Sequence, residues 1–150
     1  MIRKILAEEI DDIFVSGYTE HTETYYKFSP LFWWVYIKYN EKYLVLSSND
    51  GTISYEYCKA IECRFDIENQ DLFTITSISK NKFGKVSLLD LIYDEFENLV
   101  SIGIFIFENQ QYLFFDSINV NGFIIKESQK REIFLYKLSN EKFRLITYQI

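Results

Sequence analysis

The residue types that most often carry enzyme chemistry are scarce in this sequence. His21 is the single histidine of the 150 residues, and Glu20 and Glu23 flank it. A lone histidine excludes a His-ligated metal cluster and an acid/base mechanism that uses two histidines. The alternating polar residues around His21 are typical of an exposed strand or loop, so we expect this imidazole on the surface.

The two cysteines, Cys58 and Cys63, are also too few for a zinc site or a disulfide framework. Neither has a histidine close in sequence to activate it, so we expect reduced, mostly buried thiols rather than a nucleophile. The five glycines are scattered and form no phosphate-binding loop; Asn49-Asp50-Gly51 instead predicts a hairpin turn. We therefore expect no catalytic, cofactor-binding or metal-binding residues, and no enzymatic activity, although a carboxylate pair remains open on residue types alone.

Basic and aromatic residues come together in one short segment that predicts a possible nucleic-acid contact. Lys80 and Lys82 precede Phe83, which could stack on a base while the lysines contact phosphate. Lys137 and Arg144 would extend that surface. The chain as a whole opposes this hypothesis, because 16 basic residues against 22 acidic residues give a net charge of −6. A solvated loop is the favoured interpretation.

Acidity and aromatic content instead favour binding to a protein. The chain has 14 Phe, 12 Tyr and 2 Trp, which is 19% aromatic residues, and Tyr and Trp are common at the energetic centres of protein interfaces. We expect a set of acidic and aromatic side chains to contact the partner. These are Glu8, Asp11, Asp12, Asp90, Asp94, Glu97, Trp34 and Tyr36, with Phe32 on the same strand face as the last two.

Two helices are expected to carry the acidic residues. Apolar residues at helical spacing predict one helix over residues 2–14 and another over 88–99, where Ser87 and Asp90 would form a capping box. Asp90, Asp94 and Glu97 would then form an exposed acidic stripe on the second helix. Solubility alone would also explain such a stripe.

Hairpins of β-branched and aromatic residues are expected elsewhere. The segments 37–44, 106–113 and 137–144 share a turn containing Asn followed by an aromatic residue. The first predicts pairing of Ile37 with Leu44 and of Val35 with Leu46. The second is apolar on both faces and should be central in a sheet. The third would place Lys137 opposite Arg144.

These elements predict a single α+β domain over residues 1–150, dominated by β-structure. Two helices would pack on one or two strongly bent antiparallel sheets of about eight to ten short strands. The similar hairpins raise a possible internal duplication of a helix-plus-hairpins unit, with halves at 1–80 and 87–150. Convergence of similar turns is the alternative.

The profile resembles that of a small cytosolic inhibitor that covers the cationic site of a basic protein. The most concrete form is an immunity protein that neutralises a cognate bacterial toxin such as a nuclease, with acidic side chains replacing phosphates. A β-sheet that binds nucleic acid, a carrier of a small apolar ligand, and a homo-oligomer joined through the C-terminal edge strand 143–150 remain alternatives. The sequence shows no signal-peptide pattern and no membrane-spanning run, so we expect a cytoplasmic protein.

Overall fold

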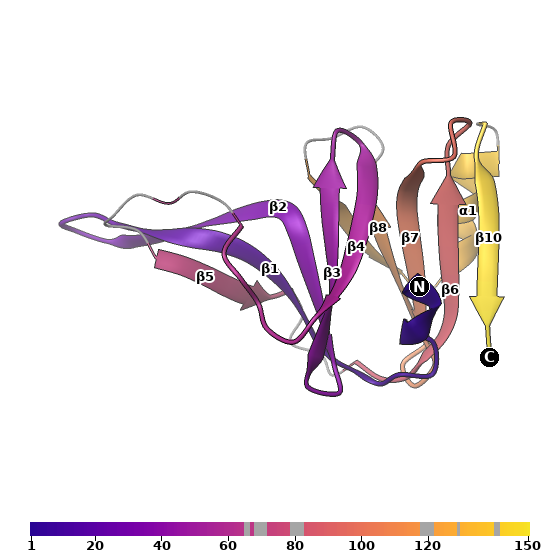
Figure 1. The fold of residues 1–150 in the computed structure, drawn as a ribbon, viewed down its shortest axis with the longest axis horizontal. Coiled ribbons are helices and arrows are strands. Elements are labelled where there is room, and N and C mark those ends of the chain that lie inside the picture. The colour runs from indigo at the N-terminus through magenta and orange to yellow at the C-terminus, as the bar shows by residue number, and fades with distance from the viewer. Residues whose placement is uncertain (65–66, 68–71, 79–82, 118–121, 129, 140–141) are drawn as a thin grey trace.

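Two antiparallel sheets dominate the part of the chain that the structure describes. The computed structural model describes residues 1–64, 67, 72–78, 83–117, 122–128, 130–139 and 142–150, with the side chains of 137–139 outside the description. Within these residues the chain forms ten strands, one α-helix and one 3-10 turn (Figure 1). The prediction of two helices packed on a sheet is therefore wrong, whereas the antiparallel β-structure is confirmed.

The first sheet is built from the N-terminal half of the chain, and its strand order is β4-β3-β2-β1-β5. It follows the 3-10 turn η1 (Ile2–Ile5) and contains β1 (Ile10–His21), β2 (Tyr26–Tyr39), β3 (Lys42–Asn49), β4 (Thr52–Cys58) and β5 (Leu72–Ser77).

The second sheet has the order β10-β6-β7-β8-β9. It contains β6 (Val86–Tyr93), β7 (Leu99–Ile106), β8 (Gln111–Asp116), β9 (Ile124–Ser128) and β10 (Arg144–Gln149), and α1 (Arg131–Ser139) precedes β10. In each sheet four strands follow one another as a meander, and the fifth pairs with the first. The β2–β3 and β7–β8 hairpins, whose sequences are similar, therefore occupy equivalent places in the two sheets. The unit that recurs is a five-stranded sheet and not a helix with hairpins.

The helix expected over residues 2–14 is not formed, and the segment from Ile10 onward is the start of β1. Only Ile2–Ile5 forms a 3-10 turn, and Ala7 then adopts a left-handed conformation (φ 66°) that ends it. Ile13 and Val15, two residues apart, are buried on the face of β1 that packs toward the second sheet. Pairing with β2 and β5 on either side buries β1, and this outweighs the helical spacing of its apolar residues.

The helix expected over residues 88–99 is also wrong, since strand β6, a turn and the start of β7 occupy this segment. β6 is buried on both faces, with Leu89 and Leu91 in the core between the sheets and Ile92 in a smaller cluster under α1. Burial on both faces removes the alternation of apolar and polar residues that identifies a strand. In the turn, the Asp94 carboxylate accepts hydrogen bonds from the backbone N–H groups of Phe96 and Asn98, each at 2.9 Å.

The third hairpin, expected at 137–144, is not formed. Lys137 lies in α1, and Arg144 pairs with Tyr93 of β6 instead. The helix forms here because it buries Phe134 against the outer face of the second sheet, where the Phe134 and Phe114 rings stack at 5.1 Å.

The other two hairpins are formed, the first in the predicted register and the second in the predicted central position. Ile37 pairs with Leu44 and Val35 pairs with Leu46, as the two-residue turn at Asn40 requires. The β7–β8 hairpin is central in the second sheet, with the main core on one face and α1 on the other. The C-terminal strand β10 lies at an edge of that sheet, as expected.

The two sheets are joined where β1 and β6 begin, and part of the first sheet extends away from the second. Backbone hydrogen bonds from Ala7 to Val86, from Val86 to Glu8 and from Ile10 to Gly84 join the start of β1 to the start of β6. The far halves of β1 and β2 extend away from the body together with β5 and form an arm (Figure 1). β2 is paired with β3 only from Trp34 onward, so this residue marks where the arm leaves the body.

Candidate binding site at the bulge of strand β2

A large irregularity in β2 lies at the base of the arm. Val15 pairs with Val35, but the next residue of β1, Ser16, pairs with Leu31, so residues 32–34 of β2 have no partner in β1. Such bulges bend a strand and redirect its side chains. Here the bulge consists of Phe32, Trp33 and Trp34, which include both tryptophans of the sequence.

The second sheet holds the bulge in place. The Phe32 carbonyl accepts a 2.7 Å hydrogen bond from the backbone N–H of Phe123, whose ring is buried in the main core. Gly122 allows this close approach, since its φ is +118° and an added Cβ would lie 3.1 Å from the Phe32 oxygen and 3.2 Å from Cδ1 of Trp33. The two tryptophans are therefore presented by a braced segment of backbone.

The β3–β4 turn completes a pocket beside the bulge. Asp50 and Gly51 both have positive φ (49° and 82°), which is the backbone of a tight two-residue hairpin turn. The pocket has a volume of about 310 Å³ and is lined by Trp33, Trp34, Ser48, Asn49 and Asp50. The two indole rings meet edge to face, with centroids 5.9 Å apart and an interplanar angle of 79°.

The aromatic patch expected on β2 is only partly present. Phe32 and Trp33 are 40% and 38% exposed, and Trp34 is half-buried in the pocket wall. Tyr36, in contrast, is fully buried, so its predicted role as a surface contact is wrong. The segment after β4 reaches Tyr36, whose hydroxyl donates a 3.3 Å hydrogen bond to the Glu62 carbonyl. Tyr36 lies after the bulge, where β2 is again paired with β1, whereas Phe32 and Trp33 lie in the bulge itself. The sequence did not reveal where the bulge lies.

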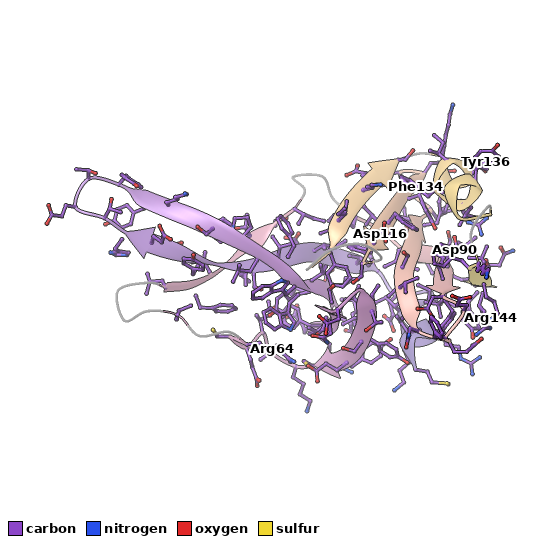
Figure 2. The ribbon with its side chains drawn as sticks, turned by 90° about the horizontal axis from the view of Figure 1, so that it is seen from above. Arg64, Asp90, Asp116, Phe134, Tyr136 and Arg144 are labelled. Atoms are coloured by element: carbon purple, nitrogen blue, oxygen red, sulfur yellow. The ribbon has the colours of Figure 1, made fainter. Side chains whose placement is uncertain are left out.

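Asp90 is likewise not a surface residue. Its carboxylate is completely buried beneath α1 (Figure 2) and accepts four hydrogen bonds. Arg131 donates two of them, from Nε at 2.6 Å and from a terminal nitrogen at 2.7 Å. The hydroxyls of Tyr112 and Thr147 donate the others, at 2.8 and 2.6 Å. A docking role for Asp90 is excluded because its charge is already paired and enclosed.

The same cluster has a strongly perturbed tyrosine but lacks the features of an active site. Burial, and then the neighbouring Asp90 carboxylate, raise the pKa of Tyr112 well above its ordinary range. Perturbed groups often mark catalytic sites, but structural ion pairs perturb pKa values too. Each Asp90 oxygen already has two donors, and the cluster is covered by the helix that carries Arg131. Its evident role is to fix α1 to the sheet.

The remaining acidic residues form two separate groups. Glu8, Asp11 and Asp12 lie at the start of β1, and the Asp12 carboxylate accepts a 2.6 Å hydrogen bond from Ser77. Asp94 and Glu97 lie in the β6–β7 turn. The backbone carbonyl of Glu8 accepts a hydrogen bond from Val86, the first residue of β6, and Asp94 directly follows the last residue of that strand. The eight-residue strand therefore separates the two groups. A single acidic docking surface of all these residues is not formed.

The surface expected to contact nucleic acid is not assembled in the described residues. Lys80 and Lys82 lie outside them, as does the side chain of Lys137. Phe83 is only 5% exposed and belongs to the main core, so it cannot stack on a base. Arg144 forms an ion pair with Glu97, and its guanidinium lies 4.8 Å from the centre of the Tyr93 ring.

The cysteines and the histidine form no catalytic arrangement. His21 is exposed at the end of β1 and contacts Tyr26 edge to face at 4.7 Å. Cys58 and Cys63 form no disulfide; Cys58 is half-buried and Cys63 exposed, so the expectation of mostly buried thiols is wrong for Cys63. Burial and the Glu56 carboxylate raise the pKa of Cys58, which favours the unreactive thiol form. The described residues include no cluster of His, Cys, Asp or Glu that could hold a metal ion.

Comparison with known proteins gives no relative: no family model, no curated protein and no solved structure matches this chain. Among the described residues, no helix has both the length and the apolar character needed to cross a membrane.

The pocket at the β2 bulge is therefore the best candidate site. Sequence reasoning identified Trp34 and recognised the hairpin turn at Asn49, Asp50 and Gly51, but it did not bring the two together. Pro30 was an available signal, since proline within a strand is found mainly at edges and bulges.

Proposed function

We propose that this protein is a non-catalytic module that binds a basic protein partner, most concretely an inhibitor that covers the cationic site of a cognate toxin. The observation that carries the proposal is the braced bulge of β2, which exposes Phe32 and Trp33 beside the acidic turn at Asp50. Exposed tryptophan on rigid backbone is typical of the energetic centre of a protein interface. Bracing by Phe123 lowers the cost of ordering these side chains on binding.

The overall charge supports the same partner class. A net charge of −6 attracts a cationic protein over long range and speeds association. The arrangement differs from the one expected from sequence, because a contiguous acidic surface is replaced by an aromatic pocket with one carboxylate at its rim.

The test is a comparison of captured partners between variants. The full chain and the variant Trp33→Ala/Trp34→Ala are immobilised and exposed to extract of the source cells, and retained proteins are identified by mass spectrometry. Tyr136→Ala serves as the matched control, because Tyr136 is 73% exposed on α1, away from the bulge. We expect a basic protein that the wild type and the control retain and the double variant loses.

The captured partner is then purified and its affinity measured at low and high salt. We expect the dissociation constant to rise at least tenfold between 50 and 300 mM NaCl, because steering between opposite charges is screened. If the partner is a toxin, its activity is inhibited by the wild type but not by the double variant. Retention of the same proteins by wild type and double variant, or binding that salt does not affect, would contradict the proposal.

A further inference from the structure

The pocket at the β2 bulge has the composition of a site for an organic cation. We propose that it receives an arginine side chain of the basic partner, with the guanidinium against the indole rings of Trp33 and Trp34 and its charge matched by the Asp50 carboxylate. This inference rests on the proposed function and specifies the chemical group that the partner inserts.

The two indole rings provide the aromatic part of the site. They come from consecutive residues and lie nearly perpendicular, so they form two walls of one pocket. The face of an indole ring carries negative charge density and attracts cations, with tryptophan the strongest of the aromatic side chains. Perpendicular aromatic walls are also how proteins enclose quaternary ammonium groups.

Asp50 provides the charge. It is exposed in the β3–β4 turn and lines the pocket. Within the described part of the chain, its carboxylate makes no hydrogen bond or ion pair. Several other carboxylates are engaged, such as those of Asp12 with Ser77 and Glu97 with Arg144. Asp50 is thus available to pair with a cation brought by a ligand.

Size and shape favour arginine over lysine. A volume of about 310 Å³ accepts a side chain and its planar head group, but is at the lower limit for a drug-sized ligand. Guanidinium is planar and weakly hydrated, stacks on indole and binds a carboxylate through two parallel hydrogen bonds. The ammonium of lysine is more strongly hydrated and does not stack.

The sequence supplies a specific probe for this site. Its only two tryptophans both line the pocket, so tryptophan fluorescence and the two indole N–H signals of a 1H–15N spectrum report on the pocket alone. The wild-type protein is titrated with the capped peptide Ac-Gly-Arg-Gly-NH2. The same peptide with citrulline, which has nearly the same shape but no charge, is titrated in parallel, as is the lysine peptide.

We expect saturable shifts of both indole signals with the arginine peptide, binding at least tenfold weaker with citrulline, and intermediate binding with lysine. Asp50→Asn should weaken binding of the arginine peptide about two- to fivefold, which is the usual range for an ion pair at an exposed carboxylate. Asparagine tolerates the left-handed conformation that Asp50 adopts, so the turn is retained. Asp11→Asn, an exposed aspartate on β1, is the matched control and should leave binding unchanged.

The outcomes separate this inference from the proposed function. Equal binding of arginine and citrulline peptides, no indole shift with either, or no effect of Asp50→Asn would overturn the arginine site. If the captured partner is nevertheless lost by the Trp33→Ala/Trp34→Ala variant, the proposed function stands and only the arginine site fails. A native circular dichroism spectrum and melting temperature of each variant exclude loss of folding as the cause.

Discussion

At the scale of single residues, Asp90 carries a buried charge that its neighbours must compensate. A fully buried carboxylate is stable only when its charge is paired and its oxygens are hydrogen-bonded, and here four donors from three side chains meet that requirement. Arg131 supplies the only formal positive charge among them. Because Arg131 begins α1, the ion pair also sets where the helix lies on the sheet.

Removing the charge of Arg131 should be costly. We expect Arg131→Met to lower the free energy of unfolding by about 3 kcal/mol, since it leaves a buried carboxylate without a counter-charge. The matched control is Arg144→Met, because the Arg144–Glu97 pair is largely exposed and should contribute no more than about 1 kcal/mol. Urea denaturation of both variants measures the difference, and equal losses would contradict this account.

Gly103 makes the Asp90 cluster possible. It lies opposite Asp90 in β7, and a Cβ there would lie 1.7 Å from the Tyr112 hydroxyl and 2.3 Å from its ring. We expect Gly103→Ala to destabilise the protein by about 3 kcal/mol, because the ring must move off Asp90.

A double-mutant cycle tests this cause. In a Tyr112→Leu background the ring is absent, so Gly103→Ala should cost at least 1 kcal/mol less than in the wild type. Urea denaturation of the four proteins gives the coupling energy. If the effects of the two substitutions are additive, Gly103→Ala lowers the free energy of unfolding for a reason other than contact with the Tyr112 ring.

At the scale of elements, α1 behaves as a cover for the second sheet. Phe134 is 8% exposed and stacks on Phe114 with an interplanar angle of 7°, whereas Tyr136 points away from the sheet (Figure 2). We expect Phe134→Ala to cost about 3 kcal/mol and Tyr136→Ala less than about 0.5 kcal/mol. Thermal or urea unfolding checks both values, and similar losses for the two variants would mean that α1 does not cover the sheet as described.

The elements also show what the sequence could predict. The register of hairpin β2–β3 was predicted correctly because a tight two-residue turn and alternating side chains determine it locally. Hairpin β7–β8 has a longer turn, so Ile104 rather than Ile106 lies opposite Leu113, and its register was not predicted. β6 was mistaken for a helix because the ion pair Asp90–Arg131 joins distant segments, and a carboxylate whose partner is unknown is expected to face solvent. The same holds for the candidate site: Trp34 and Asp50 were visible, but their proximity depends on the bulge in β2 and on its contact with Phe123. Contacts of this kind leave no local pattern.

At the scale of the whole molecule, the abundant tyrosines link stability to alkaline pH. Tyr36 and Tyr112 are completely buried, and burial raises the pKa of each above 10, the ordinary value for tyrosine. Burial raises the pKa of Tyr39, Tyr57 and Tyr93 as well. In the unfolded chain these hydroxyls ionise near pH 10, whereas the folded protein holds them neutral.

The sign of the pH dependence follows from this difference. A group whose pKa is raised on folding contributes its full stabilisation below the pKa of the unfolded state, and loses it as pH rises toward the folded value. We therefore expect the free energy of unfolding to fall from pH 10 upward, by as much as about 1.4 kcal/mol per pH unit for each fully buried tyrosine. Urea unfolding between pH 8 and 11.5, with tyrosinate absorbance at 295 nm followed in parallel, measures both effects. Full tyrosinate absorbance at pH 11.5 with native circular dichroism would contradict the prediction, as would a free energy of unfolding that stays constant to pH 11.5.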